Sequence, residues 1–153
     1  MERHSAALTS EFLDSLTRLS RKLRTTFNAQ VTAHGLTYPR ARALLRLAKK
    51  SGVTQRELAC ELELEQPTLV RLLDRMEQLD LIVRRADPSD RRAKHVVLTE
   101  HGKEQAALVT RIGEEIRHQI FRDLPERDIR NAVDLFETIS ARIGDRSDGT
   151  PVG

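Results

Sequence analysis

The order of elements between residues 54 and 98 constrains the fold of this 153-residue chain more than any other feature. Two short helical patterns, at about 55–62 and 67–79, are joined by a tight turn. Two short runs rich in β-branched residues, 81–83 and 95–98, follow at once and predict a hairpin. A helix-turn-helix followed by such a hairpin is a winged helix-turn-helix, whose second helix enters the major groove of DNA. We therefore expect a mainly α-helical fold with a small β-hairpin as its wing.

Helical patterns also flank this central segment. One runs from near Ser5 to Ala33 with an apolar stripe at helical spacing, and a short, partly basic helix follows it. A long helix starts after Thr99, the predicted N-cap, and Leu124-Pro125 interrupts it before a last helix that ends at Ile143. The tail, 144–153, is rich in Gly, Ser, Asp and Pro and is expected to be disordered.

Length and composition favour one soluble domain, expected over residues 1–143. About 150 residues suffice for a buried core, and no stretch approaches the roughly 20 apolar residues of a membrane-spanning helix. The N-terminus lacks the layout of a secretory signal, and the one cysteine cannot form an internal disulfide, so we expect a cytoplasmic protein. Only five residues are aromatic, which argues against a stacking platform for single-stranded nucleic acid.

The net charge of +3 is concentrated in one segment. Residues 84–94 contain five basic and two acidic side chains, so the rest of the chain is neutral. A compact basic segment on a balanced protein is typical of phosphate contact, because neutralising phosphates releases counterions. The alternative is an ordinary solvated loop, since blocks of like charge are often only solvated.

Two motifs resemble one family. Residues 65–71 (EQPTLVR) and 89–94 (SDRRAK), followed by 98–100 (LTE), resemble the MarR family of bacterial transcription regulators, and most of all its SlyA branch. The strong similarity covers about residues 54–102. The resemblance implies a homodimer held by helices within 5–34 and 100–143, with a DNA-binding lobe over 37–98 that reads a near-palindromic site.

The resemblance also implies the DNA-binding residues. Arg71 matches the recognition-helix arginine and would contact guanine or a phosphate, whereas Asp90 and Arg92 match the wing pair. A narrow A·T-rich minor groove suits Arg92, and Asp90 would accept its hydrogen bonds and orient the guanidinium. The complete set of candidates is Gln66, Thr68, Arg71, Arg75, Asp90, Arg91 and Arg92.

Each of these candidates also has a structural alternative. Arg71 would otherwise be a solvated surface side chain, and Arg75 would form an ion pair with Asp74 or Glu77. In a regular strand Arg91 points away from Arg92, which leaves it on the wing surface or against a phosphate. The remaining cations of the wing are expected to contact a phosphate or to be solvated: Arg84, Arg85 and Lys94.

The chain departs from the family at two positions. Asp80 stands after the recognition helix where many members have glycine, although the turn is expected to survive. No cysteine lies in the first helix, where the peroxide-sensing branch has its reactive thiol. Cys60, in the third helix, is interpreted as a small packed side chain rather than as a redox sensor. The histidines show no spacing typical of a metal site.

The family further implies a pocket for a small aromatic or anionic effector. His34, Tyr38 and Arg42 are candidate lining residues, with core or surface roles as the alternative. The leading hypothesis is thus a homodimeric, sequence-specific regulator that binds an inverted repeat in double-stranded DNA and is released by such a ligand. A non-specific DNA-coating protein is the alternative. The sequence contains no catalytic motif that favours an enzyme, and no cofactor or membrane association is expected.

Overall fold

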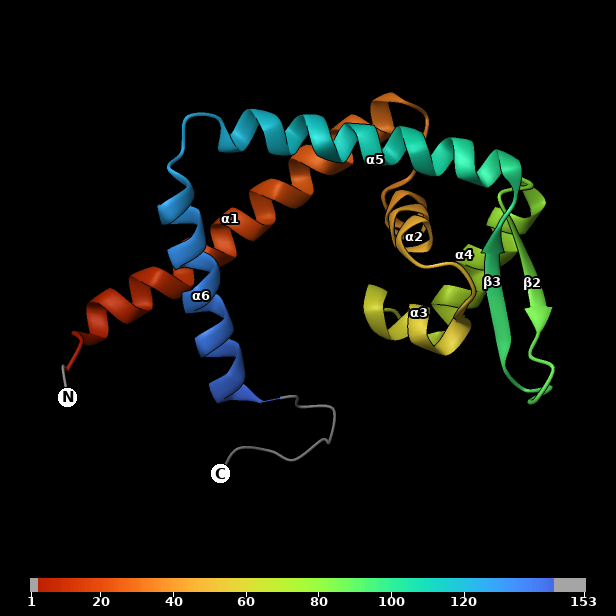
Figure 1. The fold of residues 1–153 in the computed structure, drawn as a ribbon, viewed down its shortest axis with the longest axis horizontal. Coiled ribbons are helices and arrows are strands. Elements are labelled where there is room, and N and C mark those ends of the chain that lie inside the picture. Colours follow the sequence, from red (N-terminus) through yellow and green to blue (C-terminus); the bar gives the residue numbers. More distant parts are fainter. Residues whose placement is uncertain (1–2, 145–153) are drawn as a thin grey trace. The chain divides into compact units, whose positions relative to one another are not determined.

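The fold is mainly helical with a small antiparallel sheet, as predicted (Figure 1). The computed structural model describes residues 3–144, so all of the predicted disordered tail except Gly144 lies outside the described residues. Six helices and three strands occur there: α1 (Ala6–Ala33), α2 (Tyr38–Lys49), β1 (Val53–Thr54), α3 (Gln55–Leu62), α4 (Gln66–Gln78), β2 (Ile82–Ala86), β3 (Lys94–Leu98), α5 (Glu100–Phe121) and α6 (Glu126–Ile143).

Local signals set the helix ends much as expected. The Thr54 hydroxyl accepts a hydrogen bond from the Glu57 N–H at 3.1 Å and caps the start of α3. The Thr99 hydroxyl accepts one from the Gly102 N–H at 2.9 Å and caps α5. Gly35, with φ of 79°, follows the end of α1, where its missing Cβ permits the left-handed backbone.

The sheet is larger than the predicted hairpin. Its strand order is β1-β3-β2, and β1 pairs with β3 through Val53 opposite Val96. The strands of the hairpin also extend into the basic segment, since β2 ends at Ala86 and β3 begins at Lys94. The predicted ends were wrong because Arg84 and Arg85 occupy strand positions without the β-branched side chains that signal a strand.

One core orients the helix-turn-helix and the wing. Leu69, Leu73 and Met76 of α4 are fully buried, together with Leu44 of α2 and Val96 of β3. Burial of this face leaves the opposite face of α4 exposed along its whole length. The recognition helix and the wing are therefore positioned by the same hydrophobic contacts.

The chain forms two compact units, residues 1–116 and 117–153, and α5 contributes to both. In the first unit, α1 exposes apolar side chains such as Leu13 and Leu19. In the described part of the second unit no residue of α6 is buried, and Leu135 and Ile143 are exposed. Within residues 3–144, every helix is too short or too polar to cross a membrane.

Candidate nucleic-acid interface

All the α4 residues that were predicted to contact DNA are exposed. Thr68, Arg71 and Arg75 follow the side of the helix away from the buried leucines, and Gln66 is exposed at its first position. The helix begins at Gln66, one residue earlier than predicted, with Pro67 in its first turn. Asp80 adopts a left-handed backbone with φ of 59° in the turn that follows, so the turn survives without glycine.

The wing tip, residues 87–93 between β2 and β3, is shaped by two aspartates. Asp87 Oδ1 accepts hydrogen bonds from the Ser89 N–H at 2.8 Å and the Ser89 hydroxyl at 2.6 Å. Asp90 Oδ1 accepts one from the Arg92 N–H at 3.0 Å. Asp90 thus holds the backbone of Arg92, and its predicted role in orienting the guanidinium stays a prediction.

The two arginines of the wing tip lie in a turn, so the expected alternation of strand side chains does not apply to them. Arg91 and Arg92 are both exposed. Within residues 3–144 neither guanidinium has an ion pair or a side-chain hydrogen bond. Their charges are available to a ligand.

His95 connects the wing tip to the rest of the sheet. Its Nε2 lies 2.7 Å from Asp87 Oδ2, and its Nδ1 lies 2.6 Å from the Gly52 carbonyl oxygen. Both partners are acceptors, so the doubly protonated imidazolium satisfies both at once. Asp87, and then the Gly52 carbonyl, raise the pKa of His95. Hydrogen bonds from Ser89 and then His95 hold the pKa of Asp87 well below its usual range.

Arg84 has a structural role instead of the predicted contact with phosphate or solvent. Its Nη2 donates to Asp74 Oδ1 and to Glu77 Oε2, both at 2.6 Å, and its side chain is 16% exposed. These bonds connect β2 to α4 and, through Glu77 first, raise the pKa of Arg84. Among the described residues Arg75 accordingly forms no ion pair with Asp74 or Glu77 and donates to Gln78 Oε1 at 3.4 Å.

A cleft of about 540 Å³ brings the helix and the wing together. Gln66 lines it from the start of α4, and Asp90 and Arg92 line it from the wing tip. Sequence reasoning missed Gln55 and Arg56 at the start of α3, since no spacing connects them to the wing. The full lining is Thr54, Gln55, Arg56, Gln66, Asp90, Arg92, Ala93 and Lys94.

Comparison with known proteins identifies the family. The MarR-family profile matches residues 34–93, which include α2, β1, α3, α4, β2 and the wing tip. The crystal structure of transcriptional regulator PA3341 is 34% identical, with a TM-score of 0.79, and the match covers 86% of this chain and 97% of that one. The chain belongs to the MarR family.

Two more solved structures resemble this MarR-family chain. A MarR-family regulator from Rhodococcus sp. RHA1 is 27% identical, with a TM-score of 0.72, over 88% of this chain and 96% of that chain. The regulator SlyA is 22% identical, with a TM-score of 0.73, over 86% and 93% respectively. The likeness to SlyA shows the fold alone, so the expected closeness to the SlyA branch stays a prediction.

Two of the three candidate effector residues lie together in this MarR-family fold. The Tyr38 ring meets Phe27 edge-on, with 6.0 Å between ring centroids, and the Arg42 guanidinium lies 5.8 Å from the centre of the Tyr38 ring. Arg42 Nη1 also donates to the Leu62 carbonyl at 3.1 Å. His34 instead places Nδ1 2.9 Å from a main-chain carbonyl oxygen of α1.

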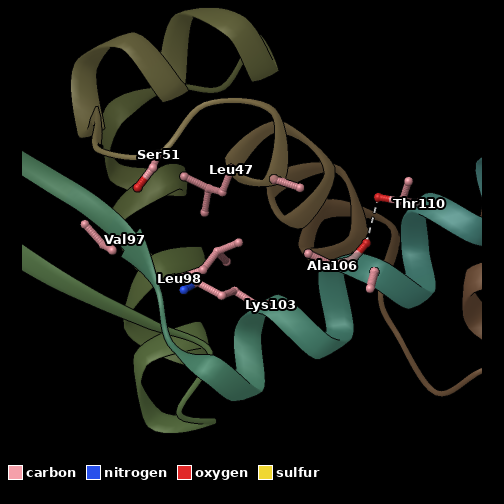
Figure 2. A pocket seen from close by; sticks show the side chains of 9 residues that line it. Leu47, Ser51, Val97, Leu98, Lys103, Ala106 and Thr110 are labelled. Carbon is pink, nitrogen blue, oxygen red and sulfur yellow. Dashed lines mark hydrogen bonds between the residues drawn. The ribbon is translucent and has the colours of Figure 1, made fainter.

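A separate hollow of about 480 Å³ lies between α2, β3 and α5 (Figure 2). Its walls are mainly apolar, and Lys103, Ser51 and Thr110 supply the polar groups. None of the three candidate effector residues lines it. The lining is Leu47, Ala48, Ser51, Val97, Leu98, Lys103, Ala106, Ala107 and Thr110.

The prediction that Cys60 is packed was wrong, because its side chain is exposed. Helix α3 has only eight residues and buries Leu58, Ala59 and Leu62, which leaves position 60 on the outward face. In the part of the chain that the structure describes, no cluster of three or more His, Cys, Asp or Glu side chains is arranged to hold a metal ion.

Proposed function

We propose that this MarR-family chain is a transcriptional regulator that binds double-stranded DNA sequence-specifically. One observation carries the proposal: the start of α4, at Gln66, and the wing tip line one cleft, and the exposed guanidinium of Arg92 there has no protein partner within residues 3–144. A duplex supplies the phosphate oxygens and base edges that such an exposed guanidinium can contact.

The two elements have different roles in this proposal. Arg71 contacts guanine or a phosphate in the major groove, while Gln66 and Thr68 reach base edges from the start of the helix. Arg92 enters the minor groove, where A·T-rich sequence deepens the negative potential. Asp90 supports this contact indirectly, since its bond to the Arg92 N–H sets the backbone from which the side chain extends.

We also propose that the chain acts as a homodimer on an inverted repeat. Support comes from the exposed apolar side chains of α1 and, separately, of α6, because apolar patches of several hundred Å² are seldom left uncovered. Sedimentation at micromolar concentration tests this part. We expect a mass of two chains, and a monomer would contradict the homodimer.

A small aromatic or anionic effector is the third part of the proposal. The contact between Tyr38 and Arg42 supports it, since an aromatic face beside a cation suits an aromatic carboxylate. Benzoate is a suitable probe, and it should weaken DNA binding by the wild type but not by Tyr38→Leu. Equal effects on the two proteins would exclude Tyr38 from the effector site.

Selection from a random duplex pool at near-physiological salt tests DNA recognition. We expect enrichment of an A·T-rich inverted repeat with half-sites about one helical turn apart. Binding without enrichment, with a salt slope of about −0.9 per neutralised phosphate, would instead indicate the non-specific coating protein. A bound effector could prevent DNA binding by the purified protein. Denaturation removes such an effector, so the selection is repeated with refolded protein as the control.

A further inference from the structure

Arg40, in the first turn of α2, contains a buried donor without an acceptor. Its Nε is shielded from solvent and has no hydrogen-bond partner within the described residues. Nearly all buried donors in proteins are satisfied, so an unsatisfied one indicates a missing partner. Because the guanidinium is also charged, the partner that fits it best is an anion.

Helix α4 packs beside α2, and its Arg75 is the charged group that acts on Arg40. Burial and then repulsion from Arg75 lower the pKa of Arg40, and no carboxylate offsets them. The carboxylates closest to Arg75 in sequence, Asp74 and Glu77, are both bonded to Arg84. Within residues 3–144, Arg75 donates to the neutral amide of Gln78 and forms no ion pair. In the part of the chain that the structure describes, these two guanidinium groups on adjacent helices therefore lack a neutralising acid.

We propose that Arg40 and Arg75 together bind one phosphate group of the DNA backbone. A phosphate has several acceptor oxygens and accepts hydrogen bonds from two guanidinium groups, which removes the repulsion between them. Arg75 is also on the exposed face of α4, one turn beyond Arg71, which places this phosphate beside the major-groove contacts. The inference rests on the proposed function and adds α2 to the surface that binds DNA.

The salt dependence of binding to the selected operator tests this proposal. Arg40→Met keeps the apolar stem of the side chain but removes the charge. We expect about tenfold weaker binding and a slope of log K against log salt that is less steep by about 0.9 for each bound chain, with sequence preference unchanged. Arg40→Lys should restore most of the slope. Arg111→Met, at an exposed arginine of α5, is the matched control and should behave as the wild type.

A double-substitution cycle tests whether the phosphate is shared. If Arg40 and Arg75 bind the same group, the two losses are not additive, and the double variant binds about as weakly as Arg40→Met alone. Additive losses would overturn the shared site. Without DNA, Arg40→Met should be at least as stable as the wild type, because the repulsion is removed, and a clear loss of stability would assign Arg40 a structural role instead.

The outcomes separate the two proposals. A wild type without preference for the operator over a scrambled duplex would contradict the proposed function itself. A wild type that binds specifically, with an unchanged slope in Arg40→Met, would overturn only the phosphate site. If Arg40→Met keeps the slope but loses stabilisation of the free protein by inorganic phosphate, the occupant is a free anion and the DNA assignment is wrong.

Discussion

The base and the tip of the wing use the same residue type in opposite ways. At the base, which comprises β2 and β3, Arg84 is largely buried and bonded to two carboxylates of α4. At the tip, Arg91 and Arg92 are exposed, and their guanidinium groups have no bonds within residues 3–144. A charge paired within the protein stabilises the fold, whereas an exposed unpaired charge is available to DNA. The five cations of this segment are therefore not one uniform basic patch.

The largest expected effect lies next to the base of the wing, where α5 begins. Gly102, in the first turn of α5, packs directly on the main chain of Leu81, and an added Cβ would overlap the Leu81 carbonyl oxygen. Gly102→Ala should lower the free energy of unfolding by about 3 kcal/mol, because backbone must move. Gly113→Ala is the control in the same helix, with open space around the new methyl, and should gain about 0.5–1 kcal/mol. Denaturant titration measures both, and equal changes would contradict the close contact.

At the tip, a substitution should reduce binding and leave stability unchanged. Arg92→Ala should weaken operator binding by about 1–3 kcal/mol, the range for one good base-edge contact. Its unfolding should match the wild type within about 0.5 kcal/mol, since the side chain is exposed. Fluorescence anisotropy with the selected operator gives the affinity. An unchanged affinity would remove Arg92 from the interface.

At Arg84 the opposite result is expected. Arg84→Met should lower the free energy of unfolding by about 1 kcal/mol, a modest value because both carboxylate partners are near the surface. Arg85→Met, at the exposed neighbour in β2, is the control and should have little effect on stability. If Arg84→Met lost affinity without losing stability, Arg84 would belong to the DNA contact and the distinction between base and tip would fail.

The smallest effect concerns pH at the junction of base and tip. The pKa of His95 is higher in the folded protein than in the unfolded chain. Protonated His95 therefore stabilises the fold fully below pH 6.5, and this stabilisation is lost as the pH rises through the raised pKa. Asp87 has a depressed pKa, so its contribution is present above pH 3.8 and is lost on acidification. The Tm of the wild type should fall as the pH rises above 6.5, and the Tm of His95→Gln should not show this fall. The same decline in His95→Gln would assign it to another group.

The helices were predictable because their signals are local. Apolar spacing along α4 and the caps at Thr54 and Thr99 involve residues within a few positions of one another. Strand β1 was missed because two residues are too few for a pattern, and its existence depends on pairing with Val96, far along the chain. Strand β2 was predicted too short because Arg84 and Arg85 continue it through pairing with β3, without side chains that signal a strand.

The candidate site was predictable in its residues but not in its pairings. The motif around Arg71 and Arg92 indicated both elements, yet the sequence favoured the helix neighbours of Arg75 as its partners. In the structure, the carboxylates of Asp74 and Glu77 instead accept hydrogen bonds from Arg84 of β2. Arg40 was not predicted at all, since its proximity to Arg75 arises only when α2 packs beside α4.

Substitution of base pairs at the wing contact tests the central claim most directly. Operators would carry A·T, G·C or inosine·cytosine pairs at the positions next to the wing tip. Inosine·cytosine presents the major-groove groups of G·C but lacks the guanine amino group in the minor groove. We predict that inosine·cytosine binds the wild type like A·T, that G·C binds more weakly, and that Arg92→Ala abolishes the difference. Equal affinity for all three duplexes would contradict minor-groove recognition by the wing.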